Sequence, residues 1–104
     1  MTIAVNVSEF ENKVTLGLFG RLDTTTAPNL QKELMGQIEE GLSVELDFAE
    51  LKYVSSAGLR VLLMGEKAAK SKDISMKLIN VSDEIMEVFD MTGFANVLQI
   101  EGAQ

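Results

Sequence analysis

The sequence predicts a single α/β domain in which helices pack on a mixed or mostly parallel β-sheet. Segments with alternating hydrophobic residues, which are typical of strands, take turns along the chain with segments whose hydrophobic residues recur every three or four positions, which are typical of helices. The chain has 104 residues, 46% of them hydrophobic and 24% charged, which is enough for one hydrophobic core and too few for two. We therefore treat residues 1–104 as one domain.

The first segments predict two strands joined by a short turn. Hydrophobic residues occupy every second position over residues 3–7 and again over residues 14–18. The polar residues 11–13 separate the two runs and predict the turn. The chain is therefore expected to enter the sheet as two consecutive strands.

A helix is expected to follow these strands. Over residues 27–38 the hydrophobic residues take the spacing of one helical face. Thr26 is placed to cap this helix, and Pro28, the only proline, lies in its first turn, where a missing amide hydrogen costs little. Gly41 is placed to end it.

The rest of the chain continues the alternation. Residues 44–48 predict a third strand and residues 57–70 a second helix. Residues 74–78 predict a fourth strand, residues 85–89 belong to a third helix, and residues 97–100 predict a short last strand. The order strand, strand, helix, strand, helix, strand, helix, strand favours a sheet with helices packed on it.

The absence of cysteine and histidine excludes several kinds of chemistry. A chain with neither residue has no thiol nucleophile, no disulfide, no histidine-centred triad and none of the nitrogen or sulfur ligands that zinc prefers. Only the oxygen groups of Ser, Thr, Asp and Glu remain. We therefore do not expect a classical hydrolase.

The charge balance makes polyanions poor partners. Sixteen acidic residues against nine basic ones give a net charge of −7 at pH 7, and such a surface repels phosphate backbones and anionic membranes. No N-terminal basic patch precedes an apolar core, and no apolar run approaches the ~18 to 20 residues that cross a bilayer. The sequence therefore predicts a cytoplasmic protein that neither binds nucleic acid nor inserts into a membrane.

Two adjacent serines, Ser55 and Ser56, lie between the third predicted strand and the second predicted helix. Open α/β sheets often place functional groups at the carboxyl ends of their strands. Either serine can also cap the helix, a role worth about 1 kcal/mol. Because one cap needs one hydroxyl, the second serine is a candidate functional residue.

The chain resembles the STAS domains of bacterial anti-sigma factor antagonists. The resemblance is carried by Leu-Asp-Phe-Ala-Glu-Leu at residues 46–51, by Val-Ser-Ser-Ala-Gly-Leu-Arg at residues 54–60 and by Gly-Arg-Leu-Asp at residues 20–23. The order of the predicted elements agrees with that fold along nearly the whole chain. The serine-glycine-leucine segment after an aspartate-bearing strand is the most specific part.

The resemblance implies a phosphorylation switch. It implies that an anti-sigma factor, itself a serine kinase, phosphorylates the serine that matches Ser56, and that only the unphosphorylated chain binds this kinase and so releases a sigma factor. A serine phosphatase would be a further partner. The resemblance also implies that the chain is not an enzyme and needs no metal and no cofactor, because the ATP and the metal belong to the kinase. The family usually has an aspartate at the position of Ser55 and often a serine or threonine at the position of Ala57. By its position in the motif Ser56 is the first choice for the modified residue, and the second hydroxyl makes Ser55 the alternative.

Other residues near the serines are candidates for contact with a partner. Gly58 either lets a partner backbone approach closely or packs its helix tightly on the sheet. Arg60 lies four residues after Ser56 on about the same helical face, so it either reaches a phosphate there or is simply solvated.

The second predicted helix has two apolar sides. Ala57, Val61, Met64 and Ala68 form one stripe, and Leu59, Leu62 and Leu63 fall on a different side. A helix that covers one sheet needs one wide stripe, so we expect Leu59 to be partly exposed and to form a docking patch with Leu63. The alternative is that both leucines belong to the core.

Two aspartates flank the serine region in the predicted fold. Asp23 and Thr24 belong to the loop before the first helix, where the resemblance implies contact with the kinase and where Asp23 can also serve as an acidic turn residue. Asp47 ends the third predicted strand, and we expect it to accept backbone amides in a structural role.

Two further functions remain open from the sequence. One is a free-standing STAS subunit that supports an ABC-type lipid transporter at the cytoplasmic membrane face. The other is a small-molecule module with an anion site at the edge of the sheet, although the chain has no glycine-rich phosphate loop.

Overall fold

The computed structural model describes residues 4–10 and 12–102, with side chains from residue 12 onward. Over these residues the chain forms a five-stranded sheet and three α-helices, as the sequence predicts. The elements are β1 Ala4–Phe10, β2 Lys13–Leu22, α1 Ala27–Glu39, β3 Ser43–Val54, α2 Ser56–Ser71, β4 Met76–Val81, α3 Asp83–Thr92, the 3₁₀ helix η1 Phe94–Asn96 and β5 Gln99–Gly102.

The sheet is mixed, with the strands in chain order from β1 to β5. β1 runs antiparallel to β2, from Ala4 beside Phe19 to Phe10 beside Lys13. The pairs β2–β3, β3–β4 and β4–β5 are all parallel. This arrangement confirms the predicted mixed, mostly parallel sheet.

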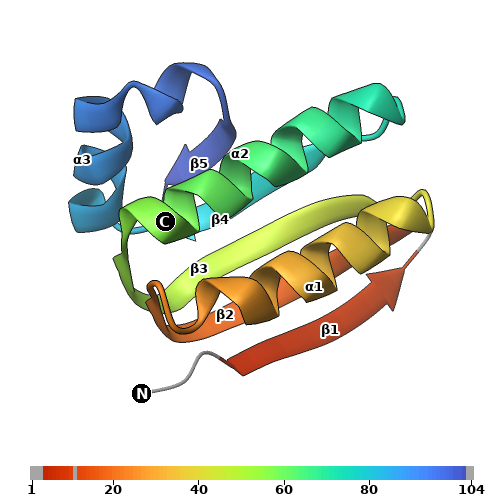
Figure 1. The fold of residues 1–104 in the computed structure, drawn as a ribbon, viewed down its shortest axis with the longest axis horizontal. Helices are drawn as coiled ribbons and strands as arrows, with labels where there is room; N and C mark the ends of the chain where they lie inside the picture. The colour runs from red at the N-terminus through yellow and green to blue at the C-terminus, as the bar shows by residue number, and fades with distance from the viewer. Residues whose placement is uncertain (1–3, 11, 103–104) are drawn as a thin grey trace.

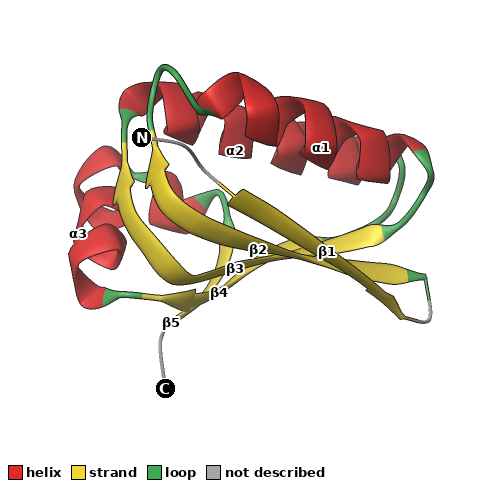
Figure 2. Cartoon of the chain, turned by 90° about the horizontal axis from the view of Figure 1, so that it is seen from below, coloured by secondary structure: helices red, strands yellow, loops and turns green. Residues whose placement is uncertain are grey.

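Two of the helices form a layer on the sheet, and the third lies apart from them. α1 and α2 lie side by side (Figure 1) and together cover one face of the sheet, while α3 is set apart from them at the end of the sheet (Figure 2). Phe48 of β3 packs against Phe89 of α3, with ring centroids 6.2 Å apart, and this contact joins α3 to the sheet. The largest fully buried side chains are Phe48, Phe89, Leu16, Leu18, Leu22, Leu30, Leu34, Ile38, Leu46, Leu62, Met76 and Leu78.

The ends of the helices follow the sequence signals closely. Pro28 occupies the first turn of α1, and Gly41 follows its end with φ +82°, a left-handed conformation that glycine adopts at little cost. α2 extends the predicted range of 57–70 by one residue at each end. No helix within the described ranges is long and apolar enough to cross a membrane.

All five strands differ from their predicted extents. β1 and β2 run on to Phe10 and Leu22, past their predicted ends at residues 7 and 18. β3 continues past Phe48 to Val54, because register shifts in β2 keep the two strands paired through residues whose side chains are largely exposed. β4 begins at Met76, two residues later than predicted. β5 begins at Gln99, because η1 and its C-cap Val97 (φ −103°, ψ −39°) hold the preceding residues in helical geometry. Position 3, where the first strand was expected to begin, lies outside the described residues.

The buried face of α2 includes Leu59 and Leu62 together with Val61, contrary to the predicted docking patch. Leu59 is only 6% exposed and Leu62 is fully buried, whereas Met64 is 40% exposed. Leu63 is half-buried. The prediction that Leu59 is partly exposed is therefore wrong. The reason is that Gly65 permits α2 to pack closely against Leu34 of α1 and Met76 of β4, and this packing turns Leu59 and Leu62 inward.

This assignment of faces predicts different costs for two truncations on α2. Leu62→Ala should lower the free energy of unfolding by about 2–5 kcal/mol, because it opens a cavity in the core. Met64→Ala should change it by less than about 1 kcal/mol, because that side chain faces solvent. Urea unfolding of the two variants and the parent measures both values, and equal losses would show that α2 is oriented differently.

Candidate functional site

The candidate site lies where β2 and β3 end side by side. Leu22 of β2 pairs with Val54 of β3 at the carboxyl ends of these parallel strands, so the loops leading into α1 and α2 start at the same edge of the sheet. The amide of Ser55 donates a hydrogen bond to the carbonyl of Leu22, with an N···O distance of 2.8 Å. This bond ties the serine loop directly to the end of β2.

The two serines have different roles. Ser55 is the N-cap of α2, with extended backbone angles (φ −94°, ψ 175°), and its Oγ accepts a hydrogen bond from the Gly58 amide at 3.4 Å. Ser56 is the first residue of the helix and is exposed. Among the hydrogen bonds between described residues, none uses the Ser56 hydroxyl. The cap therefore occupies one serine and leaves the other accessible.

Gly58 is required for packing rather than for access. It is buried, and a Cβ added there would lie 2.7 Å from Cγ of Leu22 and 3.1 Å from the Leu22 backbone oxygen. A backbone oxygen cannot move aside as a flexible side chain can. The structure thus supports the packing interpretation, and the expectation that Gly58 offers its surface to a partner is wrong.

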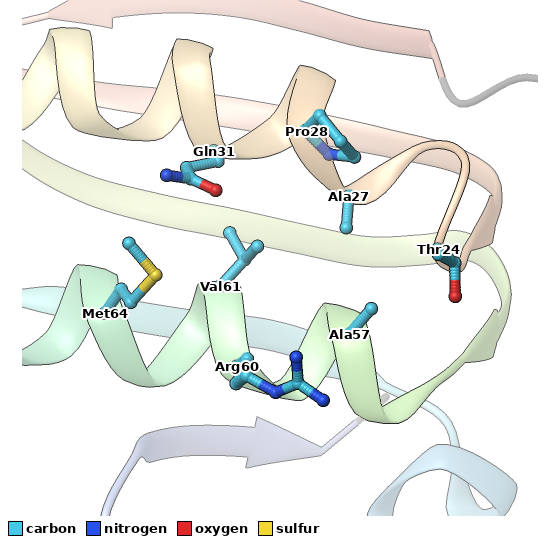
Figure 3. Close-up of a pocket in the computed structure, with 8 residues that line it drawn as sticks. All are labelled: Thr24, Ala27, Pro28, Gln31, Ala57, Arg60, Val61 and Met64. Carbon is cyan, nitrogen blue, oxygen red and sulfur yellow. The ribbon is translucent and has the colours of Figure 1, made fainter.

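A groove runs between α1 and α2 beside the start of α2. It encloses about 260 Å³, and Figure 3 shows side chains from both helices and from the loop before α1 facing it. Arg60 is the charged residue among its lining side chains, and Met64 is the exposed apolar one. The lining residues are Thr24, Ala27, Pro28, Gln31, Ala57, Arg60, Val61 and Met64.

Thr24 and Asp23 lie in the same loop before α1, but only Thr24 is free to contact a partner. Thr24 is exposed and lines the groove, as expected of a contact residue. The Asp23 carboxylate turns into its own loop, where it accepts hydrogen bonds from the amides of Thr25 at 3.0 Å and Thr26 at 3.2 Å. Asp23 therefore serves as the acidic turn residue that the sequence offered as one alternative.

Thr26 does not cap α1 with its side chain, although it occupies the N-cap position. Its hydroxyl donates to the carbonyl of Arg21 at 2.7 Å and accepts from the amide of Asp23 at 2.9 Å. The prediction of a Thr26 side-chain cap is wrong, because the buried hydroxyl instead closes the loop between β2 and α1.

Among the carboxyl groups of this region, that of Asp23 has a shifted pKa. Partial desolvation raises its pKa, but the amides of Thr26 and Thr25, the Thr26 hydroxyl and the nearby Arg21 guanidinium outweigh that effect and hold the pKa of Asp23 below its ordinary value of 3.8. The ionised form of Asp23 is therefore built into the loop.

Arg21 and Tyr53 form a contact that the sequence analysis did not single out. The Arg21 guanidinium lies 4.1 Å from the centre of the Tyr53 ring, and its Nε lies 3.6 Å from Oδ2 of Asp23. The two residues are direct neighbours in the parallel register of β2 and β3. Because only the register between the strands brings them together, the pattern of residues within either strand does not predict this contact.

Asp47 has the structural role that the sequence predicted. Its Oδ1 accepts hydrogen bonds from the Ala49 amide at 3.0 Å and from the Asn80 side chain at 3.1 Å. It lies within β3 rather than at its end, because the strand is longer than predicted. Among the described residues, no group of three or more carboxylates is placed to hold a metal ion.

Comparison with known proteins identifies relatives of the whole chain. The family described as "Mlab, STAS domain" matches residues 5–100. The anti-sigma-B factor antagonist of Bacillus subtilis is 31% identical over 100 residues, which cover 96% of this chain and 92% of that protein.

Solved structures share the fold at lower sequence identity. An anti-sigma-factor antagonist (STAS) domain protein from Planctomyces limnophilus superposes with a TM-score of 0.81 at 19% identity, covering all of this chain and 92% of that one. The unphosphorylated form of the anti-sigma factor antagonist SpoIIAA gives 0.76 at 19% identity over 97% of this chain and 90% of its own. The phosphorylated form of Bacillus SpoIIAA gives 0.73 at 20% identity over 93% and 90%.

The packing of Gly58 predicts opposite effects for two glycine-to-alanine changes. Gly58→Ala should destabilise the fold by about 1–3 kcal/mol, because the new methyl group overlaps Leu22. In Gly36→Ala of α1 the new methyl group would have no neighbouring atom within 4 Å. This change should stabilise the fold by about 0.5–1 kcal/mol, because alanine has the higher helix propensity. Denaturant unfolding compares them, and a stabilising Gly58→Ala would refute the close contact.

The lowered pKa of Asp23 predicts a pH-dependent contribution to stability. Since its folded pKa lies below its unfolded value, the carboxylate stabilises the fold at pH values above the ordinary 3.8, and this contribution is lost as the pH falls through the folded pKa. Asp23→Asn should therefore be less stable than the parent at neutral pH and approach it in acid. Thermal unfolding over a pH series measures the gap, and a gap independent of pH would contradict this role.

Proposed function

The chain belongs to the STAS-domain family, and we propose that it is an anti-sigma factor antagonist that binds an anti-sigma factor only while Ser56 is unphosphorylated. Anti-sigma factor antagonists of this family are regulatory proteins without enzymatic activity. The partner then supplies the kinase activity, its nucleotide and its metal, and this chain supplies the hydroxyl. Binding releases a sigma factor that the partner would otherwise hold.

The observation that carries the proposal is the accessible Ser56 hydroxyl beside an occupied one. Ser55 caps α2, so Ser56 can be modified without removing a hydrogen bond of the scaffold. The relative from Bacillus subtilis, 31% identical over nearly the whole chain, is an anti-sigma-B factor antagonist. The relative supports the antagonist function, and the capping role of Ser55 favours Ser56 as the modified residue, since phosphate on Ser55 would disturb the cap.

The proposed modification transfers one phosphoryl group. Oγ of Ser56 forms a bond to the γ-phosphorus of ATP, and the bond from that phosphorus to the bridging oxygen breaks. ADP leaves, and the hydroxyl proton passes to a base of the kinase. A serine phosphatase would reverse the state by hydrolysing the new ester to serine and inorganic phosphate.

The phosphate would block binding by charge rather than by unfolding. It adds about −1.5 to −2 units of charge at pH 7. The start of α2 tolerates an anion, because the dipole of a helix is positive at its N-terminus and the first turn of α2 contains no acidic residue. SpoIIAA has the same fold as this chain in both its unphosphorylated and its phosphorylated forms.

A docked partner would have to bury that anion. Weakening a complex 100-fold takes only about 2.8 kcal/mol, and a buried charge without compensation readily costs that much. The surface that would meet the partner includes Ser56, Thr24 and the groove with Arg60 and Met64. Leu59 and Gly58 are excluded from it by their burial.

The proposal predicts which serine is modified and what the modification does. After incubation with the cognate anti-sigma factor and ATP, mass spectrometry should find phosphate on Ser56 in the parent and in Ser55→Ala, and none in Ser56→Ala. In pull-downs Ser56→Ala should retain the anti-sigma factor. With the proteins held well below the Kd of the parent complex, Ser56→Asp should lose about 90% of it for a tenfold weakening and more for a larger one.

Ser55→Ala serves as the matched control, because it removes the neighbouring hydroxyl at a cost of only about 1 kcal/mol in helix capping. Phosphate on Ser55 instead of Ser56 would overturn the site assignment. Retention of a membrane ATPase by all these variants, with no anti-sigma factor bound, would overturn the function and favour the transporter subunit that the sequence leaves open.

A further inference from the structure

We propose that Arg60 binds the phosphate of phosphorylated Ser56 within the same chain. Phosphorylation would then do two things at once: it would add an anion at the start of α2 and withdraw a cation from the groove between α1 and α2. This inference rests on the proposed function, because it requires phosphate on Ser56.

The two side chains are placed for this contact. Ser56 is the first residue of α2, and Arg60 follows four residues later, so their Cβ atoms lie on one helical face roughly 5–6 Å apart. Both residues are exposed. Figure 3 shows the Arg60 guanidinium turned back toward Ala57, the residue after Ser56, and hence toward the start of the helix. A guanidinium in that place can donate two parallel hydrogen bonds to phosphate oxygens.

Among the side chains that the structure describes, no carboxylate lies within ion-pair distance of Arg60. Between side chains of residues 12–102, ion pairs within 4 Å join Lys13 to Glu45, Arg21 to Asp23, Lys70 to Glu66 and Lys77 to Glu101, and none includes Arg60. The carboxylate of the adjacent loop, Asp23, is engaged by Arg21 and by the amides of Thr25 and Thr26. The Arg60 guanidinium is therefore available when a phosphate is added.

The groove would change when the guanidinium moves. Arg60 is the charged side chain among the eight that line the groove. In a chain of net charge −7 such a cation marks a place where an acidic segment of the partner can dock. Once Arg60 pairs with the phosphate, its charge is neutralised and the groove loses this attraction. The phosphate on Ser56 would thus also change the charge of the groove between α1 and α2.

The contact can be tested by NMR on chains that carry phosphoserine at position 56, introduced during synthesis so that no kinase is needed. The second pKa of the phosphate, ordinarily about 6, follows from a ³¹P titration. Arg60→Gln should raise that pKa by roughly 0.3–0.7 pH unit relative to the phosphorylated parent, since an attractive cation favours the dianion. Arg60→Lys should restore part of the shift, because it keeps the charge without the guanidinium fork.

Lys67→Gln is the matched control. It removes one positive charge from an exposed position of the same helix, but it lies eleven residues from Ser56, roughly 16 Å along the axis and beyond the Debye length at physiological salt. It should shift the phosphate pKa by less than about 0.1 unit. Equal shifts for Arg60→Gln and Lys67→Gln would overturn the proposal.

The same samples report on the arginine directly. The chain has two arginines, and Arg21 is already held by Tyr53 and Asp23. The Nε–Hε signal of Arg60 should therefore move on phosphorylation while that of Arg21 stays in place. An unmoved Arg60 signal would refute the contact. Because the phosphate is built in, these results are independent of whether a kinase modifies Ser56, so the two proposals fail separately.

Discussion

The start of α2 is fixed against the end of β2, and this contact determines what the serine loop presents to solvent. The Ser55 amide bonds the Leu22 carbonyl, and the absent side chain of Gly58 lets the first turn of the helix rest on Leu22. With these two points fixed, Ser55 turns inward as the cap and Ser56 faces outward. The Ser55 hydroxyl therefore caps the helix, and the Ser56 hydroxyl remains accessible.

This division would let the proposed phosphorylation of Ser56 act without loss of the fold. The groups that hold the loop are backbone atoms, the Ser55 hydroxyl and buried apolar atoms, and none of them changes when Ser56 gains a phosphate. The groups proposed to face a partner include Thr24, the exposed Met64 and Arg60, which is the charged side chain of the groove. A change of charge then alters the surface, while the sheet and the two helices above it stay in place.

The sequence predicted the elements well, because their signals are local. Alternation, helical spacing, Pro28 and Gly41 all act within one element, and the strand and helix order follows from them. The STAS resemblance then identified the serine region. The errors concern contacts between elements: which side of α2 faces the sheet depends on how closely Gly58 and Gly65 approach Leu22 and Leu34. The Arg21–Tyr53 pair and the groove depend likewise on strand register and helix packing, which a single sequence does not specify.

The central claim is that a phosphate on Ser56 prevents docking while the scaffold persists. Isothermal titration calorimetry of the cognate anti-sigma factor with the unmodified and the Ser56-phosphorylated chain tests it most directly, with circular dichroism on the same samples to establish that both are folded. The account predicts identical spectra and an affinity at least about 100-fold lower for the phosphorylated chain, a difference of about 2.8 kcal/mol. Equal affinities of the two folded forms would contradict it.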